Sequence, residues 1–292
     1  MDLTEIDRVT DRLMRSLADG ETRAPAVLRF LLRRFAATAR DDLRDVLGPA
    51  IGDAIENDDG QDQDPERLIA LAEAVELSND PMLGDAVRRD AVRCRGSWPS
   101  RGPVAPAAAT VEFCLIAARA LAEPAWTSDA LDELERVIGI AYEPGDGMAQ
   151  QLTTRVRIPG DLATHVATSL ALLQAFDATG RLPYPMLAEE LMAHVERRSH
   201  VGPVGGVEGV KGDEHLERVA PVASVASLDA ARVLARLASL QRDPDYRAVA
   251  VTRGDGDRSA ERHLRAFDLA AARDPALMAA YGLALEAWLQ VT

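Results

Sequence analysis

Aromatic residues are scarce in this sequence. Phe, Trp and Tyr together make up 4% of its 292 residues, with three Trp and four Tyr among them. The hydrophobic fraction is nevertheless 47%, so a sizeable core is available, but Ala, Leu and Val have to build it. Small and branched aliphatic side chains of this kind suit closely packed helices, and the length fits one large helical domain.

Lysine is almost absent, because Lys211 is the only one in the chain. Acidic residues number 47 against 33 basic residues, which gives a formal net charge of −14. An acidic protein of this kind is repelled by a nucleic-acid backbone and by an anionic membrane surface. The composition therefore excludes both as expected partners and leaves a small polar molecule possible. It does not indicate any particular protein partner.

Cysteine and long apolar runs are also rare. The two cysteines, Cys94 and Cys114, have no metal-binding spacing, so reduced thiols in a cytoplasmic protein fit, with a disulfide still open. No run of about 18 apolar residues is present, and the N-terminus lacks the pattern of a signal peptide. We expect a cytoplasmic protein with no membrane span, no metal and no cofactor.

The clearest structural unit runs from Ile158 to Arg198 and reads as helix, tight turn and helix. Asp161 follows Pro159-Gly160 and is a plausible N-cap, because its carboxylate can accept a hydrogen bond from a free amide of the first turn. Apolar residues recur at helical spacing between Leu162 and Leu173, on a helix that is apolar almost all round. The sequence therefore predicts a buried inner helix followed by an amphipathic outer helix.

This unit is repeated along the chain. The segments VAPAAATVEFCLIAARAL, IPGDLATHVATSLALLQAF and VAPVASVASLDAARVLARL each follow a Pro-containing loop, are rich in small residues and precede an amphipathic helix. The fold class is therefore all-α, and we predict an α/α toroid of about six helical hairpins, possibly incomplete, over a single domain 1–292. Residues 96–292 carry the repeated hairpins, and 1–95 supply the N-terminal ones. An open helical solenoid is the alternative.

The helices expected from periodicity, caps and prolines can be placed along the chain. Besides the pair after Ile158 they cover residues 2–18, 24–38, 41–56, 65–77, 81–93, 104–122, 127–141, 221–240, 244–251, 258–272 and 275–290. The segment from Leu152 to Ile158 is the one β-capable piece in this reading.

The C-terminal part resembles a known group of proteins. The segments VASVASLDAARVLARLASLQRDPDYRAVA and AERHLRAFDLAAARDPALMAAYGLALEAWL look like the closing hairpins of an α/α toroid. They are most similar to the helical domain of the thioredoxin-domain-containing, spermatogenesis-associated family, and similar hairpins occur in N-acylglucosamine 2-epimerases and six-hairpin glycosidases. The resemblance implies carbohydrate-related chemistry. No thioredoxin-like domain, no CxxC and no Trp- and Gly-rich loop with a catalytic acid accompanies it.

In such a ring all inner helices begin at the same end, so the loops before them gather over one mouth. These loops are residues 96–103, 142–160 and 199–221. Helix N-termini in the mouth would favour an anionic or hydroxyl-rich ligand. The predicted ligand-binding residues are Trp98, Arg101, Tyr142, Glu143, Arg155, Arg157, His200, Glu214 and His215.

Three residues are candidates for catalysis: Asp146, Asp161 and His165. Two carboxylates such as Asp146 and Asp161 can act as acid and base in glycoside or epimerase chemistry, but they can equally be a turn residue and a helix cap. His200, Glu214 and His215 do not have a recognised metal spacing. His263 is expected at the surface.

His165 lies on a polar stripe of the inner helix. The stripe consists of Asp161, Thr164, His165 and Thr168 at i, i+3, i+4 and i+7. It either faces a cavity or holds hydroxyl groups that are satisfied locally. If it faces the mouth, His165 should be partly accessible, lie near Arg155 or Arg157 and transfer protons, since an imidazole titrates near neutral pH.

Two functions are therefore open. The first is an enzyme, or a catalytically silent relative, that binds a polar sugar-like ligand in the mouth of the ring. The second is a non-catalytic interaction or scaffold module. The shortage of Trp and Tyr favours the second, because carbohydrate sites commonly stack sugars on aromatic rings.

Overall fold

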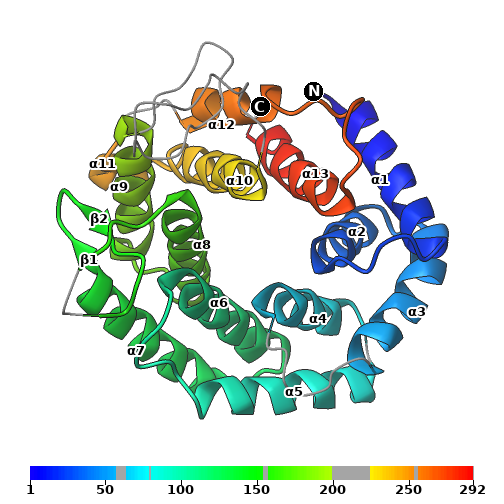
Figure 1. The fold of residues 1–292 in the computed structure, drawn as a ribbon, viewed down its shortest axis with the longest axis horizontal. Helices are drawn as coiled ribbons and strands as arrows, with labels where there is room; N and C mark the ends of the chain where they lie inside the picture. The colour runs from blue at the N-terminus through cyan, green and yellow to red at the C-terminus, as the bar shows by residue number, and fades with distance from the viewer. Residues whose placement is uncertain (57–63, 79, 154–156, 199–223, 253–255, 292) are drawn as a thin grey trace.

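The helices close into a ring with an inner and an outer layer (Figure 1). In this computed structural model the described residues are 1–56, 64–78, 80–153, 157–198, 224–252 and 256–291. Within these ranges the inner layer consists of α2 (Pro25–Thr38), α4 (Pro65–Leu77), α6 (Val104–Ala120), α8 (Leu162–Thr179), α10 (Val225–Leu240) and α13 (Pro275–Leu289).

The outer layer runs around the inner one in chain order (Figure 1). It consists of α1 (Leu3–Ala18), α3 (Asp41–Glu56), α5 (Pro81–Arg95), α7 (Pro124–Ala141), α9 (Pro183–Arg198), α11 (Pro244–Val249) and α12 (Gly256–Arg265). Each inner helix packs against the next, and α13 packs against both α2 and α1, which closes the ring. The all-α toroid is confirmed, and the ring is closed and not an open arc.

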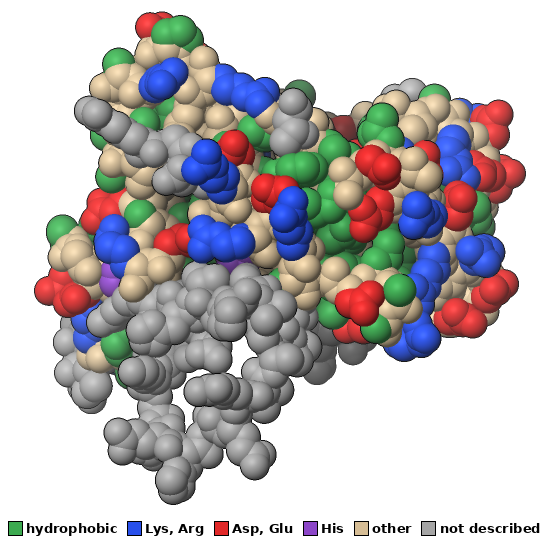
Figure 2. All heavy atoms as spheres, turned by 90° about the horizontal axis from the view of Figure 1, so that it is seen from above, with side chains coloured by type: hydrophobic (Ala, Val, Ile, Leu, Met, Phe, Trp, Pro, Cys, Tyr) green, Lys and Arg blue, Asp and Glu red, His purple; other side chains and the backbone are tan. Residues whose placement is uncertain are grey.

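The inner helices are apolar because they are covered on nearly every side. In α6 and α13 most residues are buried, and Ala makes up much of both helices. Small side chains let neighbouring inner helices approach closely, while the outer helices bury one face and keep the other polar. On the outer face seen in Figure 2, acidic and basic side chains are interspersed.

Aspartate caps and first-turn prolines set where many helices begin. Asp161 accepts a hydrogen bond from the amide of Thr164 at 2.8 Å, so the predicted N-cap of α8 is confirmed. Asp64 and Asp274 cap α4 and α13 in the same way, each followed by Pro. The repeated Asp-Pro pairs therefore fix where these inner helices start.

Several boundaries differ from the prediction. The short antiparallel strands are β1 (Tyr142–Glu143) and β2 (Gly147–Met148), ahead of the segment expected to form a strand. The helix predicted to reach residue 272 ends at Arg265, because a turn follows in which the Asp268 carboxylate accepts the amides of Ala270 and Ala271. In the ranges that the structure describes, no helix has the length and apolarity needed to cross a bilayer.

Candidate functional site

The stripe on α8 carries a buried histidine. His165 is 2% exposed, its Nδ1 lies 2.7 Å from the backbone oxygen of Asp161, and its Nε2 accepts the amide of Met148 at 3.1 Å. These two contacts assign a neutral ring with the proton on Nδ1. The expectation that His165 would be partly accessible is therefore wrong, because the β1–β2 hairpin covers the ring.

The hairpin can approach because it carries glycine at the contact. Gly147 has φ +71°, and a Cβ there would lie 2.5 Å from Nε2 of His165. The ring of His194 from α9 stacks on that of His165, with centroids 5.3 Å apart. Figure 1 shows the hairpin beside α7 and α9, at the outer edge of the ring and away from its axis.

The other predicted residues of this loop that the structure describes form hydrogen bonds and an ion pair at the hairpin. Tyr142 donates a hydrogen bond to Glu190 at 2.7 Å, and Arg157 donates to the backbone oxygens of Ala141 and Gly147. Glu143 forms an ion pair with Arg157 at 3.4 Å and is exposed. These contacts hold the loop to the ring.

The remaining predicted residues are scattered. Asp146 is exposed in the turn between the two strands, and Arg101 is exposed before α6. Trp98 is partly buried against the core. Arg155, His200, Glu214 and His215 lie outside the described residues, so their predicted role stays a prediction.

His263 is buried and not at the surface. Its side chain is 3% exposed, with Nδ1 3.0 Å from Oγ of Ser227 and Nε2 3.3 Å from Glu196. The prediction was wrong because α12 turns this face onto α10 and α9, which an isolated helical pattern does not reveal.

A cluster of charged side chains lies inside the ring. Arg29 on α2 donates to Glu73 on α4 at 3.0 and 3.1 Å and to Glu112 on α6 at 3.0 Å. All three residues are buried. Arg33 also donates to Glu73, at 2.9 Å. Burial raises the pKa of Glu73, but Arg29 and Arg33 lower it by more, to about 2. The Glu73 carboxylate is therefore held ionised.

Two more carboxylates belong to this interior. Burial raises the pKa of Glu66 on α4, and the charge of Asp229 on α10 raises it further. Burial also raises the pKa of Asp229, although Arg232 and Arg29 partly offset this. The charge of Asp229 thus affects the pKa of Glu66 although the two residues lie on different inner helices, α4 and α10. Both residues keep partial exposure.

A cavity of about 360 Å³ opens along the C-terminal halves of the inner helices. Its polar and charged lining residues are Arg29, Arg33, Glu112, Gln174, Arg232, Arg236, Ser239, Glu286 and Gln290. Its lining contains no aromatic side chain and none of the residues singled out from the sequence. Among the described residues, the polar lining of this cavity is thus supplied by the inner helices and their ends.

The sequence reasoning missed these residues because it looked for chemistry in the loops. A usable signal was present: single charged residues interrupt inner helices that are otherwise Ala, Val and Leu. Glu112 in the segment ATVEFCLIAA and Asp229 in ASLDAARVLA are examples. A charge at such a position has to find a partner or a cavity, since an unpaired buried charge is costly.

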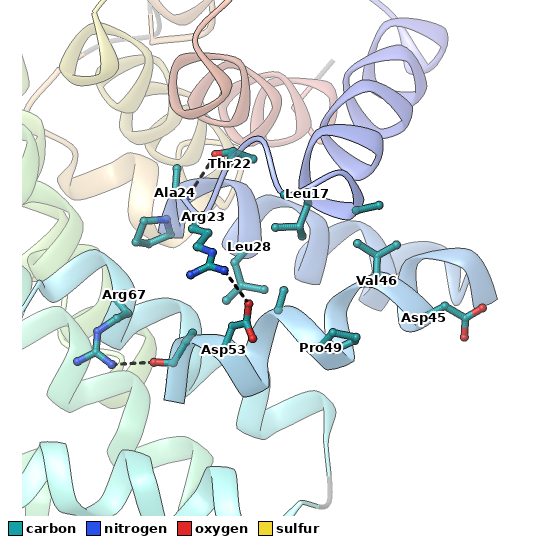
Figure 3. Close-up of a pocket in the computed structure, with 15 residues that line it drawn as sticks. Leu17, Thr22, Arg23, Ala24, Leu28, Asp45, Val46, Pro49, Asp53 and Arg67 are labelled. Carbon is teal, nitrogen blue, oxygen red and sulfur yellow. Dashed lines mark hydrogen bonds and ion pairs between the residues drawn. The ribbon is translucent and has the colours of Figure 1, made fainter. Parts of the chain in front are cut away.

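A second cavity lies at the outer rim between α1, α2 and α3 (Figure 3). It measures about 510 Å³, and Leu17, Leu28 and Val46 contribute to a mostly apolar lining. Its charged contact is an ion pair between Arg23 and Asp53 at 3.5 Å, and both side chains are more than half exposed. This groove lacks converging polar groups and is a weaker candidate than the axis.

Metal ligation has no evident site in the part of the chain that the structure describes. There, no three His, Cys, Asp or Glu side chains are grouped so that they could hold an ion. Cys94 and Cys114 are both buried thiols that are not joined in a disulfide.

The comparisons with known proteins concern the fold. No protein-family model matches the sequence, and no curated protein does. Among solved structures, a possible member of the GH105 family from Salmonella enterica is similar with a TM-score of 0.74 and 12% identity, over 99% of this chain and 95% of that one. An unsaturated glucuronyl hydrolase from Bacillus sp. GL1 is similar with a TM-score of 0.64 and 13% identity, over 91% and 84%.

A third similar structure was solved with a ligand. It is an inactive variant of the α-1,6-mannanase GH76A from Salegentibacter sp. HEL1_6 in complex with α-1,6-mannotetrose, with a TM-score of 0.72 and 11% identity over all of both chains. At such identities the likeness is one of fold. The chain therefore has the α/α-toroid architecture that glycoside hydrolases and sugar epimerases also adopt, as the sequence resemblance implied.

Proposed function

We propose that this protein is a carbohydrate-related enzyme that binds a polar, sugar-like ligand on the axis of the ring. The observation that carries the proposal is the pair Glu66 and Asp229, two partly exposed carboxyl groups on the inner helices α4 and α10 whose pKa values are raised by burial. Perturbed carboxyl groups in a cavity are typical of acid–base sites. The similar solved structures support a carbohydrate ligand, because they share this fold and are named as carbohydrate-active enzymes.

The surroundings assign different roles to the two groups. Asp229 lies 3.5 Å from Arg232, so the cation favours its ionised form, which suits a base. Burial and the negative charge of Asp229 both favour the protonated form of Glu66, which suits a general acid. One protonated and one ionised carboxyl group is the combination that acid–base catalysis on a glycoside or a sugar carbon requires.

The test is an activity screen with matched variants. The purified protein is assayed against aryl glycosides, unsaturated uronides, α-mannosides and free sugars for hydrolysis or epimerisation. We expect Glu66→Gln and Asp229→Asn each to lower kcat by about 10²–10⁴-fold, the usual contribution of a general acid or base. Asp245→Asn, which neutralises an exposed acid on α11, should leave kcat within twofold.

A thermal-shift screen with sugars and sugar phosphates separates this proposal from a non-catalytic interaction module. A specific shift with one sugar class, together with turnover that both axial variants abolish, supports the enzyme. The proposal is contradicted if no sugar in the panel binds to the protein and none is turned over. That result would favour the module, which the absence of aromatic side chains from the axial cavity also favours.

A further inference from the structure

The axial cavity is rich in arginine although the protein is strongly acidic. Four arginines line it, Arg29, Arg33, Arg232 and Arg236, against two carboxylates, Glu112 and Glu286. Both carboxylates are already engaged, Glu112 by Arg29 at 3.0 Å and Glu286 by Arg34 at 3.4 Å. The lining therefore contains more arginines than carboxylates, in a chain whose net charge is −14.

Arg232 has the longest ion-pair distance among the arginines that line this cavity. It is 8% exposed and lines the cavity, yet within the described residues no hydrogen bond reaches its guanidinium. Its ion pair there joins Nη2 to Oδ1 of Asp229 at 3.5 Å, on the same helix one turn away. A guanidinium has five N–H donors, so the ion pair with Asp229 leaves donors of Arg232 available to an acceptor in the cavity that it lines. An acceptor in the cavity would complete this site.

The flanking arginines can serve the same acceptor. Arg33 shares one oxygen of Glu73 with Arg29, and its side chain is 46% exposed. Arg236 pairs with Asp177, and its side chain is 37% exposed. Planar guanidinium forks bind carboxylate and phosphate oxygens in bidentate fashion. Arg33 and Arg232 lie more than one turn before the ends of α2 and α10, where the negative end of the helix dipole has little effect.

We propose that this cavity is a binding site for a small dianionic oxyanion, a phosphate or dicarboxylate group, held by Arg232 with Arg33 and Arg236. Neither Glu66 nor Asp229 belongs to its lining, but the ion pair between Arg232 and Asp229 places the anion site next to the proposed acid–base pair. Gln174, Ser239 and Gln290 supply neutral polar groups around the anion. A volume of about 360 Å³ admits a small metabolite and not a polymer.

The test measures anion binding directly and needs no enzymatic activity. Inorganic phosphate and succinate are each titrated into the full-length protein by isothermal calorimetry at constant ionic strength in a buffer free of both. We expect saturable binding of at least one of them, weakened at least fivefold in Arg33→Gln and in Arg236→Gln. Arg265→Gln is the matched control, since it removes the same charge from an exposed residue on the outer helix α12.

Arg232→Gln should weaken binding most, and circular dichroism must show that it folds. If Arg232→Gln does not fold, the anion affinities of Arg33→Gln and Arg236→Gln, which change more exposed residues, still test the proposal. Tighter binding of phosphate supports the site and identifies its ligand group as a phosphate, and tighter binding of succinate identifies a dicarboxylate. The proposal is overturned if neither anion binds saturably, or if Arg33→Gln and Arg236→Gln bind as tightly as Arg265→Gln.

Discussion

At the scale of the residue, His165 acts in the structure as a support for the hairpin. Its two ring nitrogens engage backbone groups before and after the loop, Asp161 and Met148, and its ring stacks on His194. The sequence placed it correctly on a polar stripe, but periodicity cannot say what covers a stripe. The hairpin that covers it comes from the preceding loop.

The corresponding prediction is that His165→Ala lowers the free energy of unfolding by about 1–3 kcal/mol, the range for losing a buried group and its hydrogen bonds. Urea denaturation followed by circular dichroism measures this. Turnover at the axis should persist at a temperature where the variant is folded. A variant with unchanged stability that no longer binds ligand would restore the catalytic role considered for His165 from the sequence.

At the scale of the element, close packing of helices closes the ring. Gly282 on α13 meets Phe30 on α2, and a Cβ at Gly282 would lie 2.5 Å from Cε2 of the ring. Phe30 is fully buried, so its ring has little room to yield. The first and last inner helices thus meet where a glycine leaves space for an aromatic ring.

We therefore predict that Gly282→Ala destabilises the protein by about 1–3 kcal/mol through overpacking, although alanine is the better helix former. Gly139→Ala is the matched control, because Gly139 lies in α7 and a Cβ there would meet nothing within 4 Å. The control should be neutral or gain up to about 1 kcal/mol. If Gly282→Ala and Gly139→Ala change the stability by the same amount in thermal and urea unfolding, the contact between Gly282 and Phe30 is contradicted.

At the scale of the whole molecule, buried ion pairs tie the ring together across three inner helices. Arg29 connects α2 with α4 through Glu73 and with α6 through Glu112. The ring therefore has a charged layer inside an otherwise aliphatic structure. Removing one of these charged side chains leaves its partners buried without an opposite charge, which is destabilising.

This layer predicts a pH dependence of stability. The pKa of Glu73 falls from 4.5 to about 2 in the folded protein, so the carboxylate binds fewer protons folded than unfolded. Its contribution, about 3 kcal/mol, is complete above pH 4.5 and is lost as the pH falls toward 2. Urea denaturation across this range should show the loss. Glu73→Gln should be less stable at neutral pH and lack this part of the slope, whereas Glu261→Gln, in an i,i+4 surface pair, should keep it.

The sequence alone determined the class and layout of this protein. Helical periodicity, Asp-Pro starts and the repeated small-residue segments predicted an all-α toroid, and the inner and outer helices lie close to where they were placed, because these signals are local. The cap role of Asp161 was also readable, since it depends on residues three positions apart.

Tertiary structure alone decided what the axis contains. Arg29, Glu73 and Glu112 lie far apart in the chain and come together because the inner helices α2, α4 and α6 pack next to one another. Packing between distant elements decides whether a polar side chain is covered or lines a cavity. His165 is covered, whereas Arg232 lines a cavity. Local patterns do not encode that packing, so the sequence determined the ring and the closed ring determined its candidate sites.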